Sequence, residues 1–495
     1  DLTLTDIFSG DVTLTAIWNA NSIKVTAHGN GGTLNATSGW TMGSGNSTAT
    51  KGLTYGSTFG TLPNASRLGY TLVGYSLENQ IDLSTWVTRQ NALFDEGKCH
   101  QGLGKISLST LDGKTGINMH PAQMYTASSQ TYEIFPFDGA AGQQYILSFS
   151  AKVTDYQTNK DNTNSVGGLG FVYSDGTRGA TPTEFVYAAD GWQLGAVASS
   201  EGKTVIGVYA YYNYGAYAFY TDVNIGETIT ADTVVNTTSD VDIYARWATD
   251  DYTITYDLAG GTLSHKNFIR YNINSTFTLN NPTKDGYTFA GWTGSNGTTP
   301  QTTVTIQAGT TGNKSYTANW AGNVVKVTLD KQGGTGGTDY VYFRVGADYA
   351  YDNAELSGDP LLGVSVPTRT GYRFVGYYTG TDGTGSCMTL TSSGKLQSDF
   401  TSAFITDTTL YAYWTANNYT VTFDTNGGST LNVTSLSVTF GAAYNKNGSF
   451  PTDPTRTGFT FAGWWTAKEG GTQITPSSTV TTAANHTLYA HWTAI

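Results

Sequence analysis

One phrase occurs four times in this chain: a glycine and an aromatic residue, then a hydrophobic residue, then a second glycine and a second aromatic residue. The copies are RLGYTLVGY from Arg67, KDGYTFAGW from Lys284, RTGYRFVGY from Arg369 and RTGFTFAGW from Arg456. A segment that recurs together with its flanking signals indicates a repeat array. The sequence therefore predicts a series of small, similar units.

Two further phrases accompany the first. An opening phrase with a glycine pair appears as IKVTAHGNGG from Ile23, YTITYDLAGG from Tyr252, VKVTLDKQGG from Val325 and YTVTFDTNGG from Tyr419. A closing phrase ends at Trp18, Trp247, Trp320, Trp414 and Trp492. Apolar and polar residues alternate in both phrases, which predicts short, half-buried strands. In the copy that ends at Trp414, Leu410 and Ala412 share the face of the tryptophan, so that ring is expected in the core.

In this order and spacing, the three phrases resemble the internalin B-type repeat, also called the Listeria-Bacteroides repeat, of bacterial surface proteins. The resemblance covers roughly two thirds of the chain. It implies a small β-grasp-like unit, an extracellular location and a role as stalk, spacer or adhesive module. It implies no catalytic residues.

The spacing of the closing tryptophans indicates an inserted domain. The interval from Trp18 to Trp247 is about three repeat lengths but holds only one opening phrase and one middle phrase. Exposed turns tolerate insertions, so we place a second domain inside the first complete repeat. The predicted segments are 1–20 (closing strands of a truncated repeat), 21–76 plus 238–249 (the interrupted repeat), 77–237 (the insert), and the repeats 250–321, 322–416 and 417–495.

The insert differs in texture from the repeats. Several strand-like runs, separated by Gly, Asp and Asn turns, predict an antiparallel β-sandwich of jelly-roll type. Its first and last strands resemble those of jelly-roll carbohydrate-binding modules. The fold class predicted for the whole chain is therefore mainly β, with tandem β-grasp-like repeats and one inserted antiparallel β-sandwich.

A candidate sugar-binding platform follows from the period of two in the insert. Ile206 and Val208 would share a core face, leaving Tyr209 and Tyr211 on the other, and Tyr220 would point away from Phe219, Val223 and Ile225. Sugar rings stack on such outward aromatic rings. The alternative is that these tyrosines pack under a loop or against a neighbouring repeat. Trp192, which follows a turn, is a further candidate for ligand contact or for a core position.

Catalytic and metal-binding patterns are missing from the sequence, and we expect no enzymatic activity and no cofactor. The histidines have neither paired spacing nor nearby carboxylates. Asp175 and Asp222 are candidates for a structural calcium site, since jelly-roll modules bind calcium through carboxylates, and are otherwise turn formers.

Composition points to an extracellular, cell-surface location in a bacterium or an archaeon. The formal net charge is −12 and charged residues make up 13% of the chain, which argues against nucleic acid as a partner. No apolar run is long enough to insert into a membrane. The candidate N-glycosylation sites are Asn35, Asn64, Asn274, Asn313 and Asn432.

The start of the sequence matches only the end of a repeat. A closing strand with Leu14, Ala16 and Trp18 on its apolar face is not stable alone in water. We expect either further repeats before it in a longer chain, or strands that complete a sheet in another copy of the protein.

Three functions fit these features. The first is a cell-surface stalk or adhesin whose insert binds extracellular glycans. The second is a structural subunit of a surface layer, sheath or filament, with copies of itself as partners. The third is a non-catalytic arm of a polysaccharide-degrading enzyme.

Overall fold

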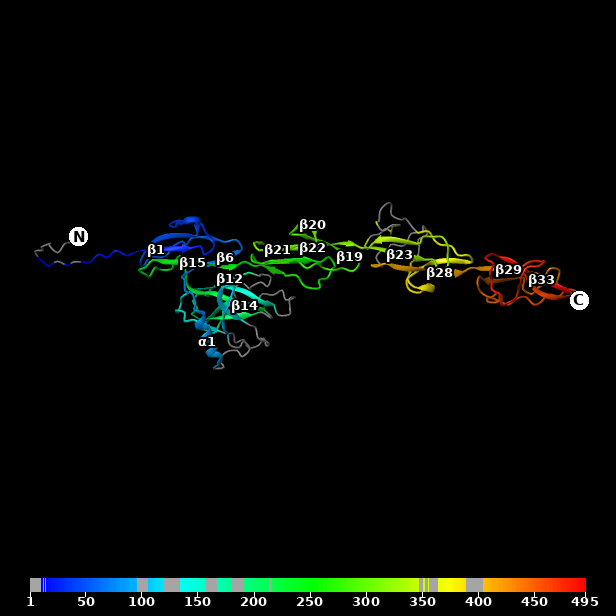
Figure 1. Ribbon diagram of the computed structural model, residues 1–495, viewed down its shortest axis with the longest axis horizontal. Coiled ribbons are helices and arrows are strands. Elements are labelled where there is room, and N and C mark those ends of the chain that lie inside the picture. Colours follow the sequence, from blue (N-terminus) through cyan, green and yellow to red (C-terminus); the bar gives the residue numbers. More distant parts are fainter. Residues whose placement is uncertain are drawn as a thin grey trace. The chain divides into compact units, whose positions relative to one another are not determined.

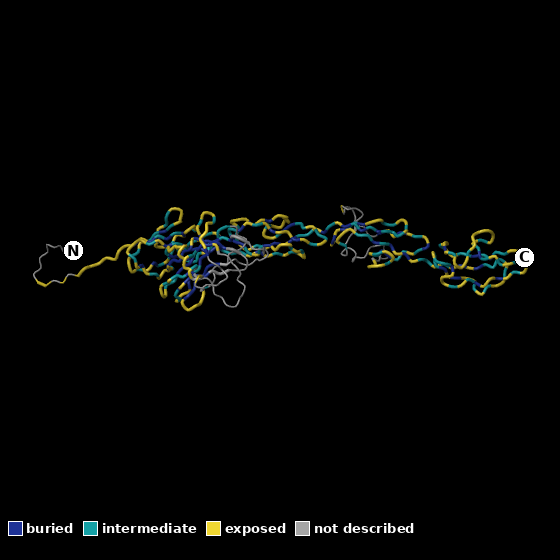
Figure 2. The backbone as a smooth tube through the Cα atoms, turned by 60° about the horizontal axis from the view of Figure 1, so that its bottom comes forward, coloured by how far each residue is buried: buried dark blue, intermediate teal, exposed yellow. Residues whose placement is uncertain are grey.

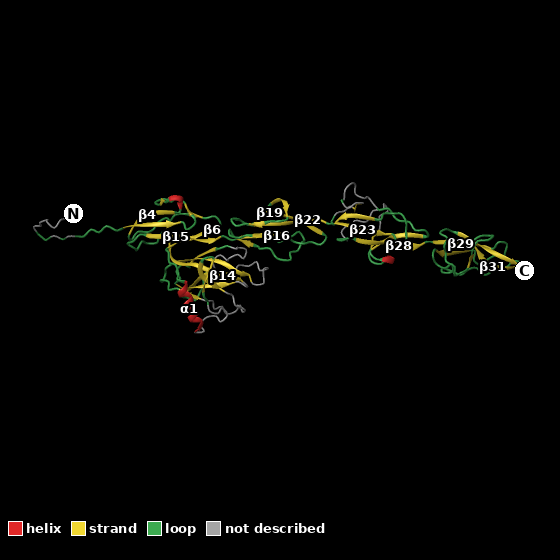
Figure 3. Cartoon of the chain, in the orientation of Figure 1, coloured by secondary structure: helices red, strands yellow, loops and turns green. Residues whose placement is uncertain are grey.

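The computed structural model describes residues 10–11, 13, 15–95, 106–119, 134–156, 167–179, 191–212, 216–346, 350–351, 355, 364–388 and 404–495. It divides into two compact units, Asp1–Pro282 with Ala290–Asn319, and Thr283–Phe289 with Trp320–Ile495. Strands dominate both units (Figure 3), which confirms the prediction of a mainly β protein. Within the described ranges, no helix has the length and apolar character needed to cross a membrane.

Each repeat contains the same four main strands. The opening strands are β1 (Ser22–His28), β16 (Tyr252–Asp257), β23 (Val324–Asp330) and β29 (Asn418–Asp424). The second strands are β4 (Thr48–Thr54), β17 (Arg270–Tyr271), β24 (Tyr340–Arg344) and β30 (Ser435–Thr439). The middle strands are β6 (Tyr70–Ser76), β19 (Tyr287–Gly294), β26 (Tyr372–Tyr378) and β31 (Phe459–Trp465). The closing strands are β15 (Val241–Thr249), β22 (Lys314–Gly322), β28 (Thr408–Ala416) and β33 (His486–Ala494).

The order across each sheet is second, opening, closing and middle strand. The opening and closing strands pair in parallel in all four repeats. Parallel neighbours need a long crossover connection, and the middle phrase lies in that connection. Short strands complete the repeats; they are β2 (Thr33–Leu34), β3 (Thr41–Met42), β5 (Ala65–Ser66), β18 (Phe277–Thr278), β20 (Gly297–Gln301), β21 (Thr305–Ile306), β25 (Ala350–Tyr351), β27 (Cys387–Met388) and β32 (Gln473–Ile474). The β-grasp description of the repeats stays a prediction.

The three recurring phrases meet in space around the closing tryptophan. Trp247 is 3% exposed and donates its indole N–H to the Gly29 carbonyl over 2.9 Å. A Cβ on Gly32, the second glycine of the opening pair, would overlap the Trp247 ring. Trp414 and Trp492 make the same contacts with their own opening turns. The glycine pair is therefore explained by the tryptophan that packs against it.

The expected face of the closing strand is confirmed in the copy that ends at Trp414. Leu410, Ala412 and Trp414 are 0%, 3% and 8% exposed, whereas Tyr413 on the opposite face is 36% exposed. Figure 2 shows the same alternation of buried and exposed residues along many strands. Burial of these alternate apolar side chains is what stabilises each small sheet.

The insert forms two layers and one helix, α1 (Leu83–Asp95). One layer contains β12 (Gln193–Ala198), β10 (Tyr145–Tyr156), β14 (Ala216–Ile229), β8 (Lys114–Met119) and β7 (Leu108–Leu111). The other contains β11 (Gly167–Tyr173), β13 (Val205–Tyr212) and β9 (Ile134–Pro136). Residues from both layers, among them Phe149, Phe171 and Val208, form one buried cluster. Trp86 of α1 belongs to this cluster and stacks on Phe135. The helix was not predicted from the sequence, and the jelly-roll topology stays a prediction.

The insert is joined to the first repeat by two chain segments that run side by side. Ser76 at the end of β6 pairs with Thr228 of β14. Beyond Ser76, residues 77–81 continue along β14, with backbone hydrogen bonds from Leu77 to Glu227 and from Ile81 to Val223. The sheet of the first repeat is thus continuous with one sheet of the insert (Figure 1). Two hydrogen-bonded strands restrict hinge motion far more than a single flexible linker does.

Candidate functional site

A polar cavity lies where the first repeat meets the insert. Its volume is about 590 Å³. The repeat contributes Asn30, Arg67, Tyr244, Arg246 and Trp247; the connecting segments contribute Glu78, Gln80, Asp222 and Asn224; and the insert contributes Ser148, Phe149, Ser150, Leu194 and Gly195. Its volume falls within the range of small-molecule sites, and its position between two domains is a common one for them.

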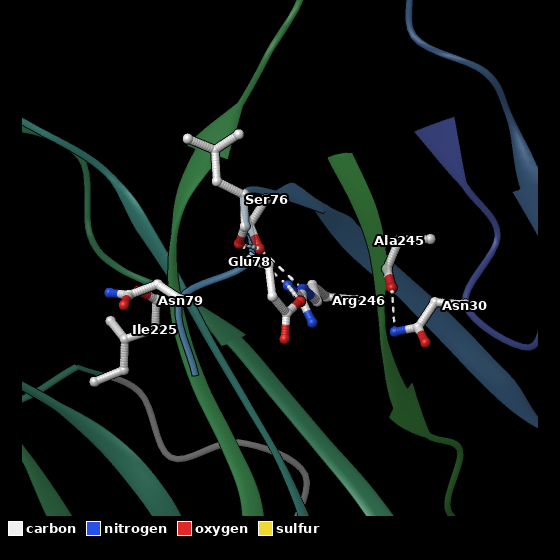
Figure 4. A network of polar contacts seen from close by, with 8 residues as sticks. Asn30, Ser76, Glu78, Asn79, Ile225, Ala245 and Arg246 are labelled. Atoms are coloured by element: carbon white, nitrogen blue, oxygen red, sulfur yellow. Dashed lines mark hydrogen bonds and ion pairs between the residues drawn. The ribbon is translucent and has the colours of Figure 1, made fainter. Parts of the chain in front are cut away.

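Arg246 organises one wall of this cavity. The side chain is 6% exposed and donates from Nε to the Ser76 hydroxyl over 2.9 Å. Its Nη2 donates to the Leu77 carbonyl over 3.1 Å. The same Nη2 donates to the Glu78 carboxylate over 2.6 Å, and Figure 4 shows Arg246 beside Glu78 and Ser76. A buried guanidinium needs such partners because an unpaired charge is costly in the interior. Arg246 therefore fixes the first residues of the insert and holds the Glu78 carboxylate at the cavity.

Tyr244 stands beside Arg246 on the same face of β15, two residues away. Its ring stacks on His28 with centroids 4.7 Å apart, and the Arg246 guanidinium lies 5.4 Å from its centroid. Burial first, and then the carboxylates of Asp242 and Glu78, raise the pKa of the Tyr244 hydroxyl. The phenol is therefore neutral at physiological pH and is able to donate a hydrogen bond.

Asn224 is the most unusual residue of the cavity. It is 2% exposed, yet neither its amide nitrogen nor its amide oxygen has a hydrogen-bond partner in the part of the chain that the structure describes. Buried polar groups are nearly always paired, and leaving one unpaired costs about 1–3 kcal/mol. A water molecule or a ligand in the cavity is able to supply the hydrogen bonds that such an amide lacks.

The prediction of an outward tyrosine platform is wrong for two of its three tyrosines, because their side chains are buried. Tyr209 is 4% exposed, and its hydroxyl donates to the Gly179 carbonyl over 3.1 Å. Tyr220 is 1% exposed and belongs to the core of the insert, together with Val223 and Ile225. The side chain of Tyr211 lies outside the described residues.

A β-bulge explains the error at Tyr220. The register of β14 against β10 shifts between the pairs Ser150–Thr221 and Ser148–Asn224, and Asp222 has a positive φ of 52°. One extra residue moves every following side chain to the opposite face. Tyr220 before the bulge and Val223 after it therefore share the core face, although strict alternation separates them.

Trp192 is half-buried and already engaged by protein groups. Its ring makes an edge-to-face contact with Phe219 at 5.9 Å, and the Lys114 ammonium lies 5.0 Å from its centroid. Its carbonyl accepts a hydrogen bond from Asn274 of the following repeat over 2.8 Å. Trp192 is outside the residues that line the polar cavity.

Each of the two candidate calcium ligands pairs with a lysine. Asp175 accepts hydrogen bonds from Thr177 and lies 3.0 Å from Lys203, and the bonds from Thr177 are the main reason that its pKa falls to about 2. Asp222 lies 2.5 Å from Lys114. Among the described residues, no three acidic, histidine or cysteine side chains are placed to hold a metal ion.

The candidate assembly and glycosylation residues differ in exposure. Trp18 is 88% exposed and Ala16 is exposed, no strand is assigned to the described residues before Ser22, and Leu14 lies outside the described residues. The exposed glycosylation candidates are Asn35, Asn64, Asn313 and Asn432. Asn274 is half-buried, and the amide nitrogen that would carry a glycan donates to Trp192. A glycan at Asn274 would break this hydrogen bond.

Sequence reasoning missed the residues that build the cavity. Arg246 occupies the position before the closing tryptophan, where the other repeats carry Asn319, Tyr413 and His491. That difference is the one signal in the sequence that could have pointed to Arg246. Asn224 and Glu78 carry no signal in sequence, because their burial depends on how the insert packs against the repeat.

Known proteins share the repeats. The model of the Listeria-Bacteroides repeat domain matches residues 252–318 and 419–491. Internalin H of Listeria monocytogenes is 36% identical over 129 residues, which are 26% of this chain and 20% of that protein. A protein of Evansella cellulosilytica named "Putative membrane protein" is 27% identical over 255 residues, 50% of this chain and 33% of that protein. The chain thus spans a fifth to a third of the length of these relatives.

A solved structure titled "The Bacillus anthracis TIE protein" covers 75% of this chain and 76% of its own at 10% identity, with a TM-score of 0.17. A score that low establishes no shared fold. The repeat matches stand on the sequence phrases, and those phrases make the contacts described above. Residues 252–318 and 419–491 are thus matched as Listeria-Bacteroides repeats, and the chain is a repeat protein of mainly β structure.

Proposed function

We propose that this chain is part of an extracellular surface protein of a bacterium or an archaeon, in which repeats carry an inserted binding domain. The repeat matches and the similarity to Internalin H support this proposal. In this protein the segments are those predicted from the sequence, with the repeats as a stalk and the insert as a jelly-roll module. A surface polar in side chains and poor in charge suits contact with glycans outside the cell.

The polar cavity is the proposed carbohydrate site. Sugars present neighbouring hydroxyl groups that both donate and accept hydrogen bonds, and amide, carboxylate and guanidinium groups match them in pairs. The cavity offers Asn224, Glu78 and Arg246 for such pairs, with Tyr244 beside them as an aromatic surface. The observation that carries the proposal is the buried Asn224 amide, with both of its polar atoms unpartnered within the described chain.

Titration of the full chain tests this proposal. The chain is screened against an array of neutral oligosaccharides, and the best binder is titrated calorimetrically with the native protein and with Asn224→Ala. We expect at least tenfold weaker binding for the variant, about 1.4 kcal/mol or more. The matched control is Asn64→Ala, which removes an exposed amide outside the cavity. Failure to bind any sugar, or equal affinity of Asn224→Ala and native protein, contradicts the site.

The alternative of a structural subunit has its own supporting observation. Ile17 and Trp18 are 90% and 88% exposed, and exposed large apolar groups mark contact sites. In this alternative, the segment up to Trp18 completes a sheet in a second copy. Sedimentation velocity over a wide concentration range distinguishes the two functions, because an assembling subunit forms species that Trp18→Ser abolishes. A single species at all concentrations rejects the alternative.

A further inference from the structure

The first glycine of the recurring phrase adopts a backbone conformation that only glycine tolerates well. Gly69, Gly286, Gly371 and Gly458 have φ values of 76°, 78°, 79° and 80°. We call each of these residues, with the aromatic residue that follows it, a glycine turn. Positive φ explains why glycine is preferred there. It does not explain what lies over the glycine, and that differs among the four copies.

An apolar side chain of the next repeat covers each of the first three glycine turns. A Cβ on Gly69 would lie 2.5 Å from Ile273, and one on Gly286 would lie 2.8 Å from Ile405 and 3.2 Å from Val345. A Cβ on Gly371 would overlap the ring of Phe440. Real Cβ atoms do not approach other atoms this closely, so these three positions have no room for a side chain.

Three of these covering residues occupy one structural position. Ile273, Val345 and Phe440 each directly follow, or lie one residue beyond, the second strand of their own repeat. Val345 and Phe440 donate their backbone N–H to Asn323 and Asn417, the third residue after a closing tryptophan. Asn323 and Asn417 in turn donate to the carbonyls of Gly286 and Gly371, each over 2.9 Å. One linker residue therefore connects a glycine turn to the side chain that covers it.

The fourth glycine turn has the same conformation without the cover. No described atom lies within 4 Å of a Cβ built on Gly458, although Ile495 donates to its carbonyl over 3.1 Å as Asn417 does to Gly371. Tyr55 of the first repeat is the converse case. It donates its N–H to Asn21 in the manner of Phe440, and its side chain is 52% exposed. The chain thus contains an uncovered turn and an uncovered docking side chain as internal controls.

We propose that the glycine turn is a docking site for the following repeat, which fills it with an apolar side chain of Ile, Val or Phe type. The recurring phrase that contains this glycine then contributes to the contact between neighbouring repeats as well as to the core of its own repeat. At the joint of the last two repeats, the Phe440 ring packs on Gly371 and meets Tyr372 edge to face at 5.5 Å. Such nearest-neighbour contacts are what couple the stability of one repeat to the next.

Backbone strain and docking are separable by experiment. Gly371→Ala introduces both strain and overlap with Phe440, whereas Gly458→Ala introduces strain alone, since the two φ values are 79° and 80°. Amide hydrogen exchange at Asn417, whose N–H lies in the joint, is measured in the full chain. We expect Gly371→Ala to speed this exchange at least tenfold and Gly458→Ala to leave it unchanged.

Rescue provides the second measurement. If overlap with Phe440 causes the effect of Gly371→Ala, that effect should shrink once the ring is removed. In a Phe440→Ala background, Gly371→Ala should then lower the unfolding midpoint temperature by no more than Gly458→Ala does in the native chain. Phe440→Ala itself speeds exchange at Asn417, whereas Tyr55→Ala does not change it. Equal effects of Gly371→Ala with and without Phe440, or an unchanged Asn417 amide in Phe440→Ala, overturn the docking role.

Discussion

The closing strand of the first repeat ends Tyr244-Ala245-Arg246-Trp247, and that of the last repeat ends Tyr489-Ala490-His491-Trp492. The inward residues make matching contacts, since each tryptophan donates to its own opening turn. The outward residues Arg246 and His491 make different contacts. Arg246 lines the polar cavity, whereas His491 stacks on Trp465 at 4.7 Å and contacts the Ala467 carbonyl at 2.8 Å.

Such a repeat is free to vary at the outward positions of its closing strand. The core contacts are fixed by the three recurring phrases, because each phrase fills space against another. The outward positions of the closing strand contact whatever lies beside the repeat. In the first repeat that neighbour is the insert, and the outward residues Tyr244 and Arg246 line the polar cavity.

The largest expected effect is loss of a closing tryptophan. Trp247→Ala leaves a cavity against Gly32 and removes one of the two hydrogen bonds that the Gly29 carbonyl accepts, and should destabilise the first repeat by about 3–5 kcal/mol. Trp492 is only half-buried, so Trp492→Ala should cost less in the last repeat. Hydrogen exchange at the amides of β1 and β29 measures both. A larger loss at Trp492 contradicts the view that burial governs this position.

Substitution of the outward residue before the closing tryptophan should destabilise the first repeat far more than the last. Arg246→Met removes the hydrogen bonds to Ser76, Leu77 and Glu78, and we expect it to destabilise the attachment of the insert by about 2–4 kcal/mol. His491→Ala in the last repeat should cost under about 1 kcal/mol, as partly exposed positions do. Limited proteolysis of the insert and urea unfolding report the two effects. Equal losses would remove the distinction between the repeats.

The first repeat should lose stability at alkaline pH through a tyrosine that the last repeat lacks, and this effect should be smaller than those above. Burial raises the pKa of Tyr75 in the first repeat to about 12, while Trp464 holds the matching position in the last repeat. Because the folded-state pKa exceeds the unfolded value of about 10, this contribution to stability is complete below pH 10 and is lost as pH rises toward and through 12.

Tyr75→Phe removes this titration. Its hydroxyl has no partner among the described residues, so the substitution should preserve stability at pH 7 and shift the alkaline unfolding midpoint of the first repeat upward. Circular dichroism during a pH titration records both. An unchanged midpoint would show that other tyrosines, such as Tyr256 with its burial-raised pKa, dominate alkaline unfolding.

Sequence patterns predicted the repeats well because their signals are local. Alternation placed Leu410 and Trp414 in the core, and the glycine pairs placed the turns. The same rule failed at Tyr220, because the bulge at Asp222 reverses the alternation and no residue type announces it. Tyr209 is buried because its ring packs against Gly170 and beneath Arg178, and its hydroxyl donates to the Gly179 carbonyl.

The candidate site was beyond the reach of sequence for a different reason. Asn224 on β14 and Glu78 just after β6 approach Arg246 only after the insert folds back on the repeat, and they are separated from it in sequence by 22 residues and by 168 residues. Contacts of that kind are set by tertiary packing. Only the departure of Arg246 from its counterparts in the other repeats was visible.

We propose that the Asn224 amide is retained for a ligand at the expense of stability. The most direct test is the free energy of unfolding of the full chain with Asn224→Leu, a substitution of similar size that removes the unpaired amide. We expect a gain of about 1 kcal/mol or more in the transition that includes the insert, together with loss of sugar binding. A loss of stability of similar size would show that the amide is satisfied in the folded protein and is not kept for a ligand.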